Sequence, residues 1–136
     1  MEKLISKARH IDTGEWVVGY YVHSGDAELP SLMFTSIDSL WPGCWKAASV
    51  DENTLCVYTG VHDASGKSIF SGDMLRHKEY NETCAVVYCH EHAQFRACFL
   101  GEHEGTSVAL GFDAAQGFEV IGNMYDEEED IHVAGA

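Results

Sequence analysis

The segment YTGVHDASGKSIFSGDML, residues 58–75, constrains the fold of this chain more than any other. Its turn-forming run, residues 62–67, lies between two extended segments. Within that run Asp63 can bond its own backbone and Gly66 tolerates a positive φ, which are the properties that a tight reversal needs. The segment therefore predicts a β-hairpin, with the neighbouring parts of the chain organised around it.

Three further segments have the composition and alternation of β-strands. Residues 4–23 predict an opening hairpin, residues 83–100 predict another, and residues 118–125 predict a closing strand. Residues 24–53 have a weaker pattern and are interpreted as a variable connection, in which residues 36–40 can form a short helical turn.

These elements predict a mainly β chain with at most short helices. The part from about residue 54 to 125 is expected to form a small, strongly bent sheet resembling an SH3-like barrel, with the N-terminal hairpin, about 4–23, packed against it. A length of 136 residues fits one domain, residues 1–125. Residues 126–136 begin with an acidic run whose like charges should keep that tail solvated or frayed.

Three ordered motifs carry a resemblance to a known family. They are Tyr58-Thr59-Gly60 with the turn ending Gly66-Lys67 and the later Gly72-Asp73, the N-terminal stretch from Lys7 to Tyr20, and residues 118–125. Together they resemble the YopX family of phage, prophage and plasmid proteins. The resemblance implies that the signature positions are structural rather than catalytic. They are Tyr58, Thr59, Gly60, Gly66, Gly72, Asp73, Gly122 and Asn123.

The charge of the chain limits its partners. With 8 basic and 22 acidic residues the formal net charge is −14, which repels both a phosphate backbone and an anionic membrane surface. The first residues lack the apolar run of a signal peptide, and no stretch is apolar enough to span a membrane. We therefore expect a cytoplasmic protein that binds neither nucleic acid nor membrane directly, and the YopX resemblance implies that the cytoplasm is that of a bacterial host. Exposed strand edges favour a protein partner and homo-oligomers.

One cluster has metal-binding chemistry. Its six candidate zinc ligands are Cys84, Cys89, His90, His92, Cys98 and His103. Cys84 and Cys89 are five residues apart, which places them on opposite faces of a regular strand, and His90 and His92 lie where the hairpin should turn. We therefore predict no metal and no cofactor. The odd count of five cysteines indicates free thiols rather than a disulfide framework.

Other motifs also favour structural roles. No local motif sets a thiol beside a base and oxyanion donors, so we predict that the chain is not an enzyme. Gly66-Lys67-Ser68 is similar to the end of a phosphate-binding loop, but position 61 is Val where that loop needs Gly. Trp41 and Trp45 could stack on a ligand, although packing in a core or an interface is the favoured interpretation.

Three functional hypotheses follow. The first is a non-enzymatic accessory protein of phage origin that binds protein or self-assembles. The second is an acidic inhibitor that mimics DNA and acts on a nucleic-acid-binding protein, which the charge alone motivates. The third is a zinc-stabilised regulatory protein, which depends on the cysteine and histidine cluster.

Overall fold

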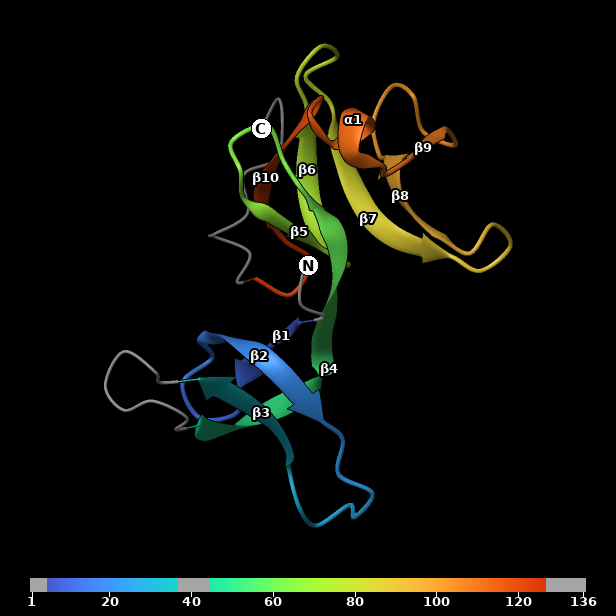
Figure 1. Ribbon diagram of the computed structural model, residues 1–136. Helices are drawn as coiled ribbons and strands as arrows, with labels where there is room; N and C mark the ends of the chain where they lie inside the picture. Colours follow the sequence, from blue (N-terminus) through green and yellow to red (C-terminus); the bar gives the residue numbers. More distant parts are fainter. Residues whose placement is uncertain (1–4, 37–44, 127–136) are drawn as a thin grey trace. The chain divides into compact units, whose positions relative to one another are not determined.

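A computed structural model describes residues 5–36 and 45–126 of the chain. The chain divides into two compact units, Met1–Tyr58 and Thr59–Ala136, called here the N-terminal unit and the C-terminal unit. The elements in chain order are β1 (Ser6–His10), β2 (Trp16–Val22), β3 (Ser31–Ser36), β4 (Trp45–His62), β5 (Ser68–Phe70), β6 (Asp73–His77), β7 (Thr83–Cys89), β8 (Gln94–Phe99), β9 (Ser107–Ala109), α1 (Phe112–Ala115) and β10 (Phe118–Asn123) (Figure 1).

The N-terminal unit is a small ring of antiparallel strands. β1, β2, β3 and β4 pair in that order, and β4 returns to pair with β1, so the four strands close on themselves. Side chains alternate between the inside and the outside of such a ring. Its centre holds the buried Ala8, Met33 and Val50, with Val17 and Tyr21 packed against them.

Gly19 on β2 permits a close approach within this ring. A Cβ atom there would lie 2.2 Å from the carbonyl oxygen of Phe34 on the neighbouring strand β3, well inside any tolerated contact. Gly19 is buried, so the clash could not be relieved by turning toward solvent. The tight spacing of β2 and β3 therefore depends on the absence of a side chain at this position.

The C-terminal unit has a larger core. β5 pairs with the end of β4, and a second antiparallel sheet runs in the order β10, β6, β7, β8, β9. The buried side chains that form its core are Ile69, Leu75, Cys84, Val86, Ala97, Phe99, Leu110, Ala115 and Phe118. Burial of these apolar groups is the main stabilising contribution to this unit.

The two outer strands of the second sheet are partly covered. At β10, Ala64 donates its N–H to the carbonyl oxygen of Phe118 (3.0 Å), and the Asp63 carboxylate accepts the N–H of Val120 (2.9 Å). At the other edge β9 is only three residues long, and the guanidinium of Arg96 donates to the carbonyl oxygen of Ser107 (3.0 Å) on it. Short and covered edges oppose pairing with another chain.

The predicted fold class is confirmed: the chain is mainly β, with two antiparallel sheets of which one is strongly curled. The hairpins expected in 4–23, 58–75 and 83–100 appear as β1–β2, β4–β5 and β7–β8. Two differences lie in the weakly patterned residues 24–53, where β3 and the first half of β4 complete the N-terminal ring. Of the helical turn expected at 36–40, Ser36 ends β3 and the rest lies outside the described residues.

The only helix found among the described residues, α1, has four residues and was not predicted. No helix in the described ranges is long or apolar enough to cross a bilayer.

Candidate functional site

Asp73 and Asn123, two of the predicted signature residues, form one buried hydrogen-bonded pair. The Asn123 side-chain amide donates to Asp73 Oδ1 (2.8 Å), and the backbone N–H of Phe70 donates to Asp73 Oδ2 (2.8 Å). The carbonyl oxygen of Gly72 accepts the N–H of Met124 (2.9 Å) beside them. These bonds fasten the turn between β5 and β6 to the end of β10.

The remaining signature residues lie at turns, at strand pairings and in the core. Thr59 donates its hydroxyl to the carbonyl oxygen of Ile69 (2.7 Å), which ties β4 to β5. The backbone φ angles of Gly60, Gly66 and Gly72 are positive. The two others are Tyr58, which is buried, and Gly122, which lies at a register shift between β10 and β6.

The six candidate zinc ligands are distributed over several environments. Cys84 is buried, and burial together with the nearby Glu82 and Cys98 raises the pKa of its thiol to about 12. Cys98, on β8, lies opposite Ala85 on β7, while His103 is hydrogen-bonded to Glu82. A thiol with so high a pKa is a poor source of the thiolate that zinc requires.

Two of the six do meet, at the tip of the β7–β8 hairpin. The Sγ atom of Cys89 lies 3.2 Å from Nδ1 of His92, while the ring of His90 packs edge-on against Tyr88. Among the described residues, no group of three or more His, Cys, Asp or Glu side chains is placed to hold a metal ion.

One polar cluster in the C-terminal unit was not predicted. Glu82 is almost buried and accepts hydrogen bonds from the ring Nδ1 (2.7 Å) and the backbone N–H of His103, and from the N–H of Gly101 (3.1 Å). The Tyr80 ring stacks between His77 (4.5 Å) and His103 (4.7 Å). Glu82 and His103 belong to different loops, 21 residues apart, so no sequence motif indicates the pair.

The contact between Glu82 and His103 shifts the pKa values of both side chains. Burial opposes ionisation of Glu82, but the hydrogen bonds from His103 and Gly101 outweigh it and lower the pKa of the carboxyl. The hydrogen bond to Glu82 raises the pKa of His103, against a smaller effect of burial, and the negative charge of Glu102 adds to the rise. The pair therefore fastens the loop after β8 to the turn before β7.

The outer side of the N-terminal ring carries an apolar face. Strand alternation and cross-strand register place its members on the same side: Tyr20 lies opposite Phe34, which lies opposite Ala47, and Val22 lies opposite Leu32. We define the apolar face as Val18, Tyr20, Val22, Leu32, Phe34, Trp45 and Ala47.

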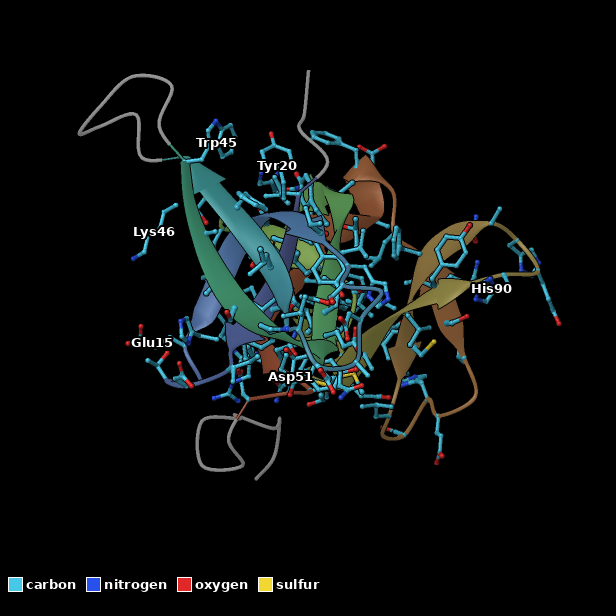
Figure 2. All side chains as sticks on the ribbon, turned by 90° about the horizontal axis from the view of Figure 1, so that it is seen from below. Glu15, Tyr20, Trp45, Lys46, Asp51 and His90 are labelled. Carbon is cyan, nitrogen blue, oxygen red and sulfur yellow. The ribbon has the colours of Figure 1, made fainter. Side chains whose placement is uncertain are left out.

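Tyr20 and Trp45 form the centre of this face. Their rings meet edge to face with centroids 5.6 Å apart, and 36% of Tyr20 and 52% of Trp45 are exposed. Figure 2 shows the two side chains close together at one end of the ring, with Glu15 and Asp51 toward the other end. Trp45 therefore packs on a surface rather than in a core, and Trp41, the other tryptophan considered, lies outside the described residues.

A family model described as YopX protein matches residues 25–131, which includes β3, β4 and all the described part of the C-terminal unit. The N-terminal motif from Lys7 to Tyr20 lies before the matched range. No curated protein matches the chain.

Proposed function

The chain belongs to the YopX family, and from that premise we propose that it is a non-enzymatic accessory protein of a phage or another mobile element, which acts by binding protein in the cytoplasm of a bacterial host. The observation that carries the proposal is the apolar face of the N-terminal ring. Monomeric proteins rarely expose large contiguous apolar patches without a binding role, and exposed Trp and Tyr are typical of interface centres.

The covered strand edges indicate that a protein partner would contact the apolar face rather than pair with a strand edge. β10 is capped by Ala64 and Asp63, β9 is three residues long, and β1 to β4 close on themselves. Strand addition therefore has few open backbone groups to use. The apolar face presents side chains instead.

The polar groups support a role without catalysis. Asp63, Asp73 and Glu82 are the buried carboxylates of the described residues, and each accepts hydrogen bonds from backbone N–H groups. Such bonds hold a carboxylate in a fixed structural position. We propose no metal and no cofactor for this function.

The proposal is tested by affinity capture from a bacterial culture that expresses the tagged chain. The test variant is Tyr20→Ser/Trp45→Ser, which removes the centre of the apolar face. The control is Val87→Ser/Tyr88→Ser, because these two side chains on β7 are each 43% exposed. Capture of the same proteins by the wild type and the control, and their loss from the test variant, is the expected result. Equal capture by all three would refute the proposal.

The DNA-mimic hypothesis remains the second candidate because the charge is unevenly distributed. Residues 59–136 hold 14 acidic and 4 basic residues. A mimic would capture a basic nucleic-acid-binding protein, retain it in the Tyr20→Ser/Trp45→Ser variant, and release it at high salt. A mobility-shift assay with duplex and single-stranded DNA completes the test, since we expect no direct binding at a net charge of −14.

A further inference from the structure

We propose that Cys89, at the end of β7, is a site of covalent modification, where the thiol forms mixed disulfides with low-molecular-weight disulfides and His92 accepts the thiol proton. The inference is separate from the proposed function, because Cys89 belongs to the C-terminal unit and the apolar face to the N-terminal unit. It depends on the contact between the two side chains, on the hairpin loop that holds them, and on the surroundings of the thiol.

The Cys89 thiol lies against a base. Its Sγ atom is 3.2 Å from Nδ1 of His92, which is within hydrogen-bond range for sulfur. A neutral imidazole can accept the thiol proton through this contact and leave a thiolate, the form of cysteine that acts as a nucleophile. The imidazolium that results is a positive charge beside the thiolate and stabilises it. The pair therefore has the two groups that an activated thiol needs.

The loop of the β7–β8 hairpin, residues 90–93, brings the two side chains together. Cys89 and Gln94 form the last pair of the two strands, so His92 lies only three residues beyond the thiol within a closed loop. Ala93 ends the loop with a φ of 50°, a left-handed conformation that alanine seldom adopts. The position of His92 beside the thiol is therefore set by the backbone of the hairpin.

The thiol faces away from the hydrophobic core. Successive side chains of β7 point to opposite sides of the sheet, and Cys84 and Val86 are the ones that enter the core. Cys89 alternates with them and shares its side of the strand with Val87, which is 43% exposed. Cys89 itself is half-buried. A small molecule in solution can therefore reach the sulfur atom.

The charged groups around the thiol come from the loop and from β8. The loop contributes the Glu91 carboxylate, which disfavours a thiolate, and His90, whose ring packs on β7. On β8, Arg96 is the diagonal cross-strand neighbour of Cys89, and its positive charge favours a thiolate. Once His92 has taken the proton, the positive charges outnumber the one carboxylate of the loop.

The modification is thiol–disulfide exchange. The Cys89 thiolate attacks one sulfur of the small disulfide, a new S–S bond forms as the old one breaks, and the released thiolate takes the proton held by His92. Cys89 is oxidised and the released half of the small molecule is reduced. An internal disulfide does not compete, because Cys98 pairs with Ala85, four positions from Cys89 along β7. The two cysteines are thus about 13 Å apart, against a limit of about 7 Å between bridged Cα atoms, and Cys84 is one position farther along the strand.

The experiment follows the reaction of the reduced full chain with hydroxyethyl disulfide by peptide mass spectrometry, from about pH 5 to about pH 9. This probe is uncharged, so the net charge of −14 does not affect its approach. Cys98 is the internal reference, because it too is partly exposed. The test variant is His92→Ala, and the matched control is His90→Ala in the same loop, whose ring packs against Tyr88 instead of the thiol. Circular dichroism checks that both variants are folded.

The expected advantage of an assisted thiol is moderate. An unassisted thiol is only a few per cent ionised at neutral pH, but a thiolate that forms more readily is also a weaker nucleophile. The two effects together leave a gain of roughly fivefold at about pH 7. We therefore expect the wild type and His90→Ala to react about fivefold faster at Cys89 than at Cys98. His92→Ala should lose this advantage.

The pH profile distinguishes a base from a merely structural histidine. The rate at Cys89 should reach its plateau at a lower pH in the wild type than in His92→Ala, whereas a loss of packing alone would leave the shape of the profile unchanged. Equal rates at Cys89 and Cys98 in the wild type, a wild-type rate in His92→Ala, or the same loss in both variants would overturn the inference. If His92→Ala does not fold, the comparison of Cys89 with Cys98 in the wild type decides.

Discussion

Replacement of Asp63 by Ala should destabilise the C-terminal unit by about 2–5 kcal/mol. The carboxylate is 3% exposed and accepts three backbone N–H groups: those of Ser65 (2.9 Å) and Lys67 (2.8 Å) through Oδ1, and that of Val120 (2.9 Å) through Oδ2. One side chain thus holds the β4–β5 turn in shape and attaches it to β10.

The three bonds differ in what their loss costs. Ser65 and Lys67 lie in an exposed turn, where water can replace the carboxylate, so each contributes about 0.5–1 kcal/mol. Val120 is half-buried in the strand, and leaving its N–H without a partner costs about 1–3 kcal/mol. The sum is a substantial part of the 5–15 kcal/mol that stabilises a typical domain.

The assay combines urea denaturation with hydrogen exchange of the Val120 amide. The control is Asp113→Ala, which makes the same change of charge at an exposed position of α1 and should alter stability by less than about 0.5 kcal/mol. Asp63→Asn keeps one acceptor oxygen, so it should lie between the wild type and Asp63→Ala. If Asp63→Ala costs under about 1 kcal/mol and Val120 stays protected, the reasoning is wrong.

Four further predictions concern other parts of the chain. Gly19→Ala should destabilise the N-terminal ring by about 1–3 kcal/mol, because its Cβ would lie 2.2 Å from a carbonyl oxygen; tryptophan fluorescence in urea measures this, with Gly25→Ala, where nothing lies within 4 Å, as a near-neutral control. The contact of Glu82 with His103 should protect residues 100–106 from hydrogen exchange most strongly between about pH 4.5 and 6.5. The raised pKa of His103 gives stability that is complete below its ordinary 6.5 and lost as pH rises through the folded value, whereas the lowered pKa of Glu82 gives stability present above 4.5 and lost as pH falls. Glu82→Gln should remove this pH dependence; a profile identical to that of the wild type would contradict it. Cys84, with a pKa of about 12, should have about one thiolate in ten thousand at pH 8, so iodoacetamide should label it only after unfolding. Purified protein should carry no stoichiometric zinc and keep its circular dichroism spectrum in a strong chelator, and one bound zinc per chain, lost together with the fold, would revive the zinc hypothesis.

The sequence predicted the hairpins because their turns are local. The run from Asp63 to Lys67 holds its own reversal through the bonds of one side chain, so a few adjacent residues are sufficient to indicate it. The long strand β4 is different. It contains Asp51, Glu52 and Asn53, which are unfavourable in strands. Asp51 pairs with Arg9, Glu52 and Asn53 lie at a register shift between β1 and β4, and the rest of this half of β4 pairs with β1 and β3 from distant parts of the chain. Such tertiary pairing has no local signal.

The apolar face was only partly predictable for a related reason. Trp45 was identified as a large aromatic, but its sequence neighbours do not tell whether it is buried. In β2 every residue from Trp16 to Val22 except Gly19 is apolar, so the alternation that would separate an inner from an outer side is missing. The closure of the ring decides which side of β2 faces inward, since Val17 and Tyr21 pack inside the ring and Tyr20 lies outside.

In the N-terminal ring, the residues that determine the fold are different from those to which we assign protein binding. Three side chains, Ala8, Met33 and Val50, fill its centre, whereas the apolar face uses the alternate positions of the same strands. Residues on the outside of the ring can therefore be substituted without altering the packing inside. Under the proposed function, the binding surface can therefore change while the fold is kept, and the seven outer positions can be randomised in the laboratory to select new binding specificities.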